Sequence, residues 1–239
     1  MAVITVFKIE GLNKDRKEVV KSLNVRSETG WFSARESKFS RYEVFIQYYF
    51  YEDVEDQIKR MFGEDDEIVT VLKNNGKTRI LKRVICFISY LTKTLEIYRG
   101  PDKVTQEIAR QIERILQIKL KPLTLKGEEL VELYKKHGIE LKQAMFKHIE
   151  GLMFETLKGS MLEANAKFRD YLEKFKSSLR VISFRPNIRY LNGGKYQITV
   201  NGDKGTIKFS EVEGFKWRPR VEIRQLVFLM AATAGWLGD

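Results

Sequence analysis

Residues 42–51, YEVFIQYYFY, give the clearest indication of the fold of this chain. Successive side chains of a β-strand point to opposite faces of a sheet, and aromatic and β-branched residues favour strands. The even positions from 42 to 50 form one apolar face, and the odd positions form a second face of Phe45, Tyr49 and Tyr51 with Glu43 and Gln47. We therefore predict a strand here. It is followed by a helix over 54–62 that Asp53 caps and Gly63 ends.

Outward from this strand, the same patterns predict an α+β protein. In the N-terminal half we expect strands at 3–9, 67–73, 78–90 and 94–99, and helices at 14–23 and 103–116. The turn Asn74-Asn75-Gly76-Lys77 predicts a tight hairpin, because Asn and Gly accept positive φ. Residues 24–40 are polar without a period, which predicts a long loop. Within this loop, Trp31-Phe32 either packs on the protein core and anchors the loop or contacts a binding partner. We favour packing on the core.

The C-terminal half repeats much of this order. Strands are expected near 119–125, 141–148, 152–157, 179–184, 195–200 and 206–209, and helices at 127–136, 160–175 and 221–237. We therefore expect antiparallel sheets with packed helices. They form either two pseudo-symmetric halves, 1–118 and 119–239, or one continuous domain. Pseudo-twofold saddles of the TATA-binding-protein kind are built from such a repeat, although the chain carries none of that family's motifs.

Composition narrows the class of protein. The 239 residues carry 43 Lys and Arg against 32 Asp and Glu, a net charge of +11 that favours polyanionic partners. A charged surface suited to a thermophile would have a similar composition. Cys86, the only cysteine, lies in an apolar run and is expected to be a buried, inert thiol. With neither a basic leader nor a long apolar run, the chain is expected to be cytoplasmic, without membrane contact and without a cofactor.

The positive charge is concentrated in two segments that are predicted to be rich in strands. Residues 73–99 hold seven basic residues against one acidic residue, and residues 180–224 hold ten against four, so each segment carries +6. Basic side chains neutralise phosphates, and exposed aromatic rings stack on unpaired bases. We predict a nucleic-acid-binding surface, for DNA or RNA, formed by Lys77, Arg79, Lys82, Arg83, Arg185, Arg189, Lys216, Trp217, Arg218 and Arg220. The two segments would form one broad cationic face if they lie together.

No catalytic motif stands out, so we expect a non-catalytic protein. The chain lacks a phosphate-binding glycine loop, and His137 and His148 have no nearby nucleophile or metal ligand in the sequence. The acidic residues at 64–67 leave a metal-dependent nuclease as a third hypothesis. The second hypothesis is a protein–protein adaptor or a homodimer, formed through the apolar helix 221–237 or through a tyrosine-rich edge strand.

Overall fold

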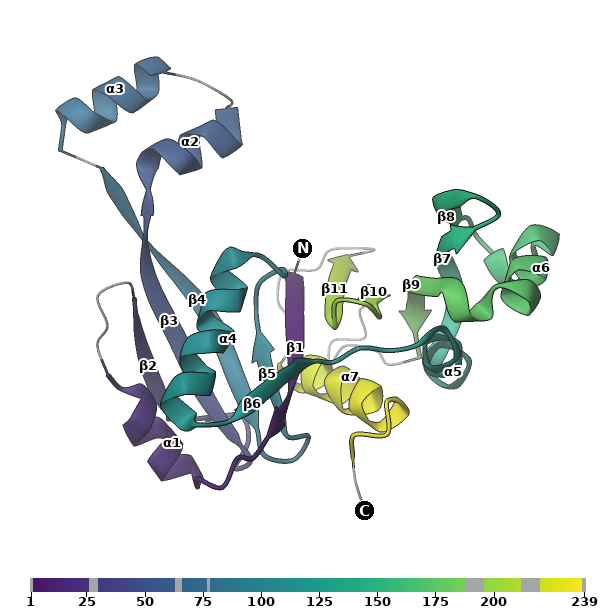
Figure 1. Cartoon of the computed structure of the whole chain (residues 1–239), viewed down its shortest axis with the longest axis horizontal. Helices are drawn as coiled ribbons and strands as arrows, with labels where there is room; N and C mark the ends of the chain where they lie inside the picture. Colours follow the sequence, from purple (N-terminus) through teal and green to yellow (C-terminus); the bar gives the residue numbers. More distant parts are fainter. Residues whose placement is uncertain are drawn as a thin grey trace.

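The computed structural model describes residues 2–25, 30–62, 66–76, 78–187, 196–211 and 220–237. The helices in these ranges are α1 (Arg16–Leu23), α2 (Val54–Phe62), α3 (Asp66–Asn74), α4 (Lys103–Leu116), α5 (Gly127–His137), α6 (Ala166–Lys174) and α7 (Arg220–Thr233). The strands are β1 (Ala2–Glu10), β2 (Trp31–Glu36), β3 (Glu43–Asp53), β4 (Arg79–Ser89), β5 (Thr94–Ile97), β6 (Lys119–Pro122), β7 (Gly138–Ile149), β8 (Leu152–Lys158), β9 (Leu179–Pro186), β10 (Tyr196–Asn201) and β11 (Thr206–Glu211). The α+β fold class is confirmed (Figure 1).

All eleven strands belong to one antiparallel sheet. Its order is β2-β3-β4-β5-β1-β11-β10-β9-β7-β8, and β6 pairs with β1. One edge of β1 pairs with β5, while its other edge pairs with β11 over residues 2–5 and with β6 over residues 7–10. The N-terminal and C-terminal strands therefore share a continuous sheet that meets at β1 (Figure 1).

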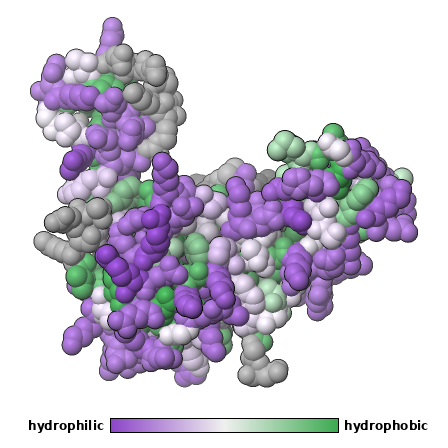
Figure 2. Space-filling model, in the orientation of Figure 1, coloured by the Kyte–Doolittle hydropathy of each residue, from purple (hydrophilic) through white to green (hydrophobic). Residues whose placement is uncertain are grey.

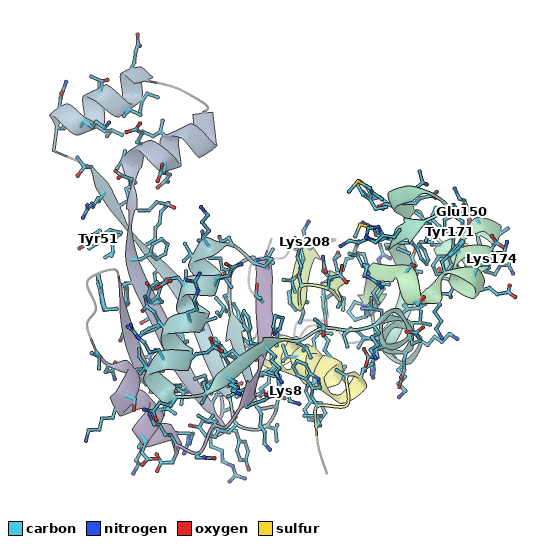
Figure 3. All side chains as sticks on the ribbon, viewed as in Figure 1. Lys8, Tyr51, Glu150, Tyr171, Lys174 and Lys208 are labelled. Carbon is cyan, nitrogen blue, oxygen red and sulfur yellow. The ribbon has the colours of Figure 1, made fainter. Side chains whose placement is uncertain are left out.

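The helices cover opposite faces of the two ends of this sheet. Phe7 and Ile9 of β1 belong to the core that contains the apolar residues of α1 and α4. Ile4 and Val6, which point to the other face, belong to the core that contains those of α5 and α7. Lys8 shares their face and lies 5.1 Å from the ring of Trp236, just beyond α7 (Figure 3). In a pseudo-twofold saddle the symmetry axis is perpendicular to the sheet, so the helices of both halves lie on the same face. Here the helices of the two halves lie on opposite faces, so the fold is not a saddle of this kind. Internal duplication stays a prediction.

The predicted strand at 42–51 is confirmed as β3, at 43–53. Val44, Ile46, Tyr48 and Phe50 are buried, as the even-numbered face requires. The long loop predicted for 24–40 is corrected in part, because residues 31–36 form β2 beside β3. The Asn24 side chain accepts a hydrogen bond from the backbone N–H of Ala34 and donates one to its carbonyl, which ties the start of this segment to α1.

The strand predicted at 67–73 is wrong, because this stretch forms α3. Its β-branched residues suggested a strand, but Val69 and Leu72 are three positions apart and pack on Val54 and Ile58 of α2. The turn at 74–76 therefore ends a helix and does not close a two-stranded hairpin. Helices α2 and α3 form an arm at the end of the long β3–β4 pair (Figure 1). The start of the helix predicted at 160–175 is also corrected, since Asn165 and not Ser160 caps α6.

Cys86 is completely buried in β4, as predicted. Burial raises the pKa of its thiol, because the thiolate would lose its hydration. We expect no reaction of the native protein with a thiol reagent such as dithionitrobenzoate at pH 8, and one equivalent of reaction after denaturation in guanidinium. Rapid stoichiometric labelling of the native protein would contradict this burial.

Among the described residues, no helix is long and apolar enough to cross a membrane.

Candidate nucleic-acid interface

Helices α1 and α4 cover one face of strands β2, β3 and β4. The open face is the part of the other face that the residues named below form. The register places Trp31 opposite Tyr49 and Tyr49 opposite Arg83, so their side chains point to the same side. The open face consists of Trp31, Ser33, Arg35, Phe45, Gln47, Tyr49, Tyr51, Asp53, Arg79, Leu81, Arg83 and Ile85, and the exposed Asp53 is the residue directly opposite Arg79. In Figure 1, α4 lies in front of the sheet, so this face points away from the reader.

The local sequence explains why aromatic rings point outward here. The even positions of β3 are buried against α1 and α4, and a strand must then turn its odd positions to the opposite face. Gly30 assists this arrangement, because a Cβ atom at this position would collide with the hydroxyl of Tyr48. β2 can thus lie close to β3, with Trp31 beside the odd-numbered tyrosines.

Three aromatic side chains form a cluster on the open face. The rings of Trp31 and Tyr49 stack with their centroids 5.4 Å apart and their planes 13° apart. The ring of Tyr51 lies 6.0 Å from that of Trp31, and 57% of Tyr51 is exposed. Figure 3 shows Tyr51 near the end of β3, where the strand leaves the body toward α2. Trp31 and Tyr49 are half-buried, and a group of large rings that is partly exposed in this way is typical of a binding surface.

Three arginines accompany these rings. Arg35, Arg79 and Arg83 are all exposed, and the guanidinium carbon of Arg35 lies 4.9 Å from the ring centroid of Phe45. Among the described residues, neither Arg79 nor Arg83 has a carboxylate oxygen within 4.0 Å of its guanidinium group. Their charges are therefore available to an anionic ligand, and the guanidinium group suits bidentate binding of a phosphate.

The structure divides the predicted binding residues of the N-terminal segment. Arg79 and Arg83 lie on the open face, whereas Lys82 points to the opposite side and lies 3.8 Å from a carboxylate oxygen of Glu52. Lys77 lies outside the described residues.

The predicted residues of the C-terminal segment do not join this surface. Arg185 lies on the opposite face of the sheet from Arg83, and its guanidinium is 3.3 Å from Glu140. Strands β4 and β9 are five positions apart in the sheet, which amounts to roughly 24 Å. The broad cationic face that we predicted is thus not formed by the described members of the two segments. The other predicted residues, Arg189, Lys216, Trp217 and Arg218, lie outside the described residues.

Arg220 is buried and cannot contact a phosphate, which corrects its prediction as a binding residue. Only 6% of it is exposed, and its guanidinium lies 2.5 Å from Glu96 and 2.6 Å from Glu43, which are both completely buried. It also donates a hydrogen bond to the hydroxyl of Tyr98 and stacks 4.0 Å from the ring centroid of Phe87. Arg220 therefore fastens the start of α7 to β3, β4 and β5.

Burial raises the pKa of Glu96, and the neighbouring Arg220 opposes that rise. The burial cost of the two carboxylates is thus offset mainly by the guanidinium group of Arg220, while Arg224 lies 3.9 Å from Glu43 at the edge of the cluster.

Sequence reasoning missed the aromatic part of the open face. Tyr49 and Tyr51 were assigned correctly to one side of a strand, but they were not connected with Arg79 and Arg83, which follow the α2–α3 arm. Trp31 was interpreted as a loop anchor because β2 was not predicted. The available signal was the second aromatic face of the YEVFIQYYFY strand itself.

A metal site is not supported by the part of the chain that the structure describes, where no group of three or more His, Cys, Asp or Glu side chains could hold an ion. Glu64 and Asp65 of the acidic cluster lie outside it, so metal binding there stays untested.

The open face is thus a sheet surface that carries three arginines, one aspartate and a group of aromatic rings. Comparison of the chain with models of known protein families, and with curated proteins, finds no match in either case.

Proposed function

We propose that this chain is a non-catalytic nucleic-acid-binding protein that uses the open face of β2, β3 and β4. The observation that carries the proposal is the placement of two exposed arginines, Arg79 and Arg83, beside the exposed ring of Tyr51 and the Trp31–Tyr49 stack; within the described part of the chain neither arginine has an ion-pair partner. Arginines bind phosphates and release counterions, while aromatic rings stack on bases. The net charge of +11 adds long-range attraction of the whole molecule to a polyanion.

The distribution of ion pairs favours the N-terminal segment over the C-terminal one. Arg180 lies 3.1 Å from a carboxylate oxygen of Asp203, and Arg185 is paired with Glu140. A phosphate would have to replace these partners, whereas Arg79 and Arg83 have none to lose among the described residues. The count of +6 overstates the charge available in both segments, because Lys73, Lys82 and Arg99 of the N-terminal segment are ion-paired as well. The N-terminal segment differs in having Arg79 and Arg83 together on one face of the sheet.

The proposal is tested by measuring the affinity of the purified protein for labelled DNA and RNA across a salt series. We expect a submicromolar dissociation constant for at least one form. We also expect a steep loss of affinity with salt, because each phosphate contact adds about 0.7 to 0.9 to the log–log slope. Weak binding to every form, lost near physiological salt, would refute the proposal.

A protein–protein adaptor remains the second candidate, on a different surface from the one first predicted. The apolar residues Leu226, Val227 and Met230 of α7 are buried in the core, so most of this helix is not free for a partner. The edge strand β8 instead exposes Leu152 (48%), Met153 (77%) and Phe154 (63%). Figure 2 shows apolar surface at this end of the molecule. Salt-tolerant association with another protein, without nucleic-acid affinity, would favour this function.

A further inference from the structure

We infer that the open face binds single-stranded nucleic acid, with unpaired bases stacked on Tyr51 and on the Trp31–Tyr49 pair. This inference rests on the proposed function and specifies its ligand. The first reason is the exposure of the rings. More than half of Tyr51 is exposed, at the upper end of the open face, so part of its ring is accessible to a flat group from outside. In a duplex the faces of the bases are already covered by their neighbours, and only their edges are exposed in the grooves. An unpaired base offers its face to a ring.

The second reason is the spacing of the rings. Tyr49 and Tyr51 are two residues apart on β3, which corresponds to roughly 6.8 Å along a strand. Stacked bases in a duplex follow one another at about 3.4 Å. Two neighbouring bases that contact both positions must therefore be separated by about twice the duplex spacing. A single strand can extend in this way, whereas a duplex must first be unstacked.

The third reason is the arrangement of charge around the rings. Arg83 lies directly opposite Tyr49 in the register, on the β4 side, and Arg35 lies on the β2 side beside Phe45. Arg83 thus flanks the aromatic cluster on the β4 side, whereas Arg35 lies four residues, roughly 13 Å, from Trp31 along β2. A strand whose bases lie on the rings can place its phosphates toward these cations, so stacking and charge neutralisation act on the same ligand. Sequence preference is expected to be weak, because every base has a π-face.

The test compares two oligonucleotide probes with three proteins at one fixed salt concentration. The probes are a 12-nucleotide single strand of mixed sequence and the duplex of the same sequence, each prepared as DNA and as RNA. The proteins are the wild type, Tyr51→Ala and Tyr42→Ala. Tyr42 is a matched control because 42% of it is exposed and it lies just before β3, at the opposite end of that strand from Tyr51. Thermal melting checks that both variants are folded.

We expect the wild type to bind the single strand at least tenfold more tightly than the duplex. Tyr51→Ala should weaken single-strand binding by roughly 5- to 150-fold, the range for losing one base–aromatic stack, and should leave duplex binding within twofold. Tyr42→Ala should leave both affinities within twofold. If the duplex binds equally well or better, or if Tyr51→Ala has no effect on single-strand binding, the single-strand inference is overturned and the proposed function stands. If neither probe binds, both are overturned.

Discussion

Replacing Arg220 by methionine is expected to lower the free energy of unfolding by about 3–5 kcal/mol, the usual cost of removing one partner from a buried charge network. Methionine preserves much of the apolar volume next to Phe87 but leaves the carboxylates of Glu43 and Glu96 buried without their nearest cation. In a chain of this length, such a loss corresponds to a decrease in Tm of roughly 6–20 °C. Chemical denaturation followed by circular dichroism measures the change directly.

Two further variants separate the charge effect from packing. Arg224 lies 3.9 Å from Glu43, and 26% of its side chain is exposed, so Arg224→Met should cost less than about 1 kcal/mol. Adding Glu43→Gln and Glu96→Gln to Arg220→Met should restore part of the lost stability, because the uncompensated charges are removed. A loss below about 1 kcal/mol for Arg220→Met would show that the network does not hold α7 on the sheet.

The same variant has an expected pH dependence. Without Arg220, burial and Glu43 raise the pKa of Glu96 against only the weaker effect of Arg224, so the pKa of Glu96 in the folded protein rises further above its value in the unfolded chain. A carboxyl group with a raised folded-state pKa contributes stability below its unfolded pKa and loses that contribution as the pH rises through its folded pKa. The stability deficit of Arg220→Met, relative to the wild type, should therefore be smaller near pH 4 than at pH 8.

The second large effect is expected from reversing two charges on the open face. Arg79→Glu combined with Arg83→Glu should weaken nucleic-acid binding about 100-fold at 0.15 M salt. Hydrogen bonds to charged groups contribute about 1.5 kcal/mol each, and two of them amount to about 3 kcal/mol. Because both side chains are exposed and have no ion-pair partner among the described residues, the Tm should change by no more than a few degrees.

A matched variant controls for net charge. Arg110 and Arg114 are exposed on α4, which covers the opposite face of the sheet, and reversing both produces the same net charge as the open-face variant. We expect this control to retain binding within about threefold. Equal losses in the two variants would mean that affinity follows net charge and that the open face has no special role.

Most of the strands and the class of fold could be predicted from local pattern, because alternation and burial act over neighbouring residues. The even-numbered face of β3 is buried as its sequence indicates. The misassigned segment, α3, has residues that favour strands but a partner helix on which Val69 and Leu72 can pack. Tertiary contact there overrides the local preference.

The site was less accessible to sequence reasoning, because its parts come from distant positions. Arg220 lies 124 residues from Glu96 and 177 residues from Glu43, and nothing in the sequence around Arg220 indicates that carboxylates surround it. The number of basic residues in a segment gives Arg220 and Arg79 the same predicted role, binding of a phosphate. Only the register of the sheet shows that the first is a structural cation and that the second stands beside an aromatic cluster.

The most direct test of the central claim is a salt series run side by side on the wild type and on the Arg79→Glu, Arg83→Glu protein with one single-stranded probe. If the open face binds the phosphate backbone, the wild type should bind at submicromolar concentration. Its log–log salt slope should then exceed that of the variant by about 1.4, the contribution of two phosphate contacts on a single strand. Identical slopes and affinities for the two proteins would contradict the claim.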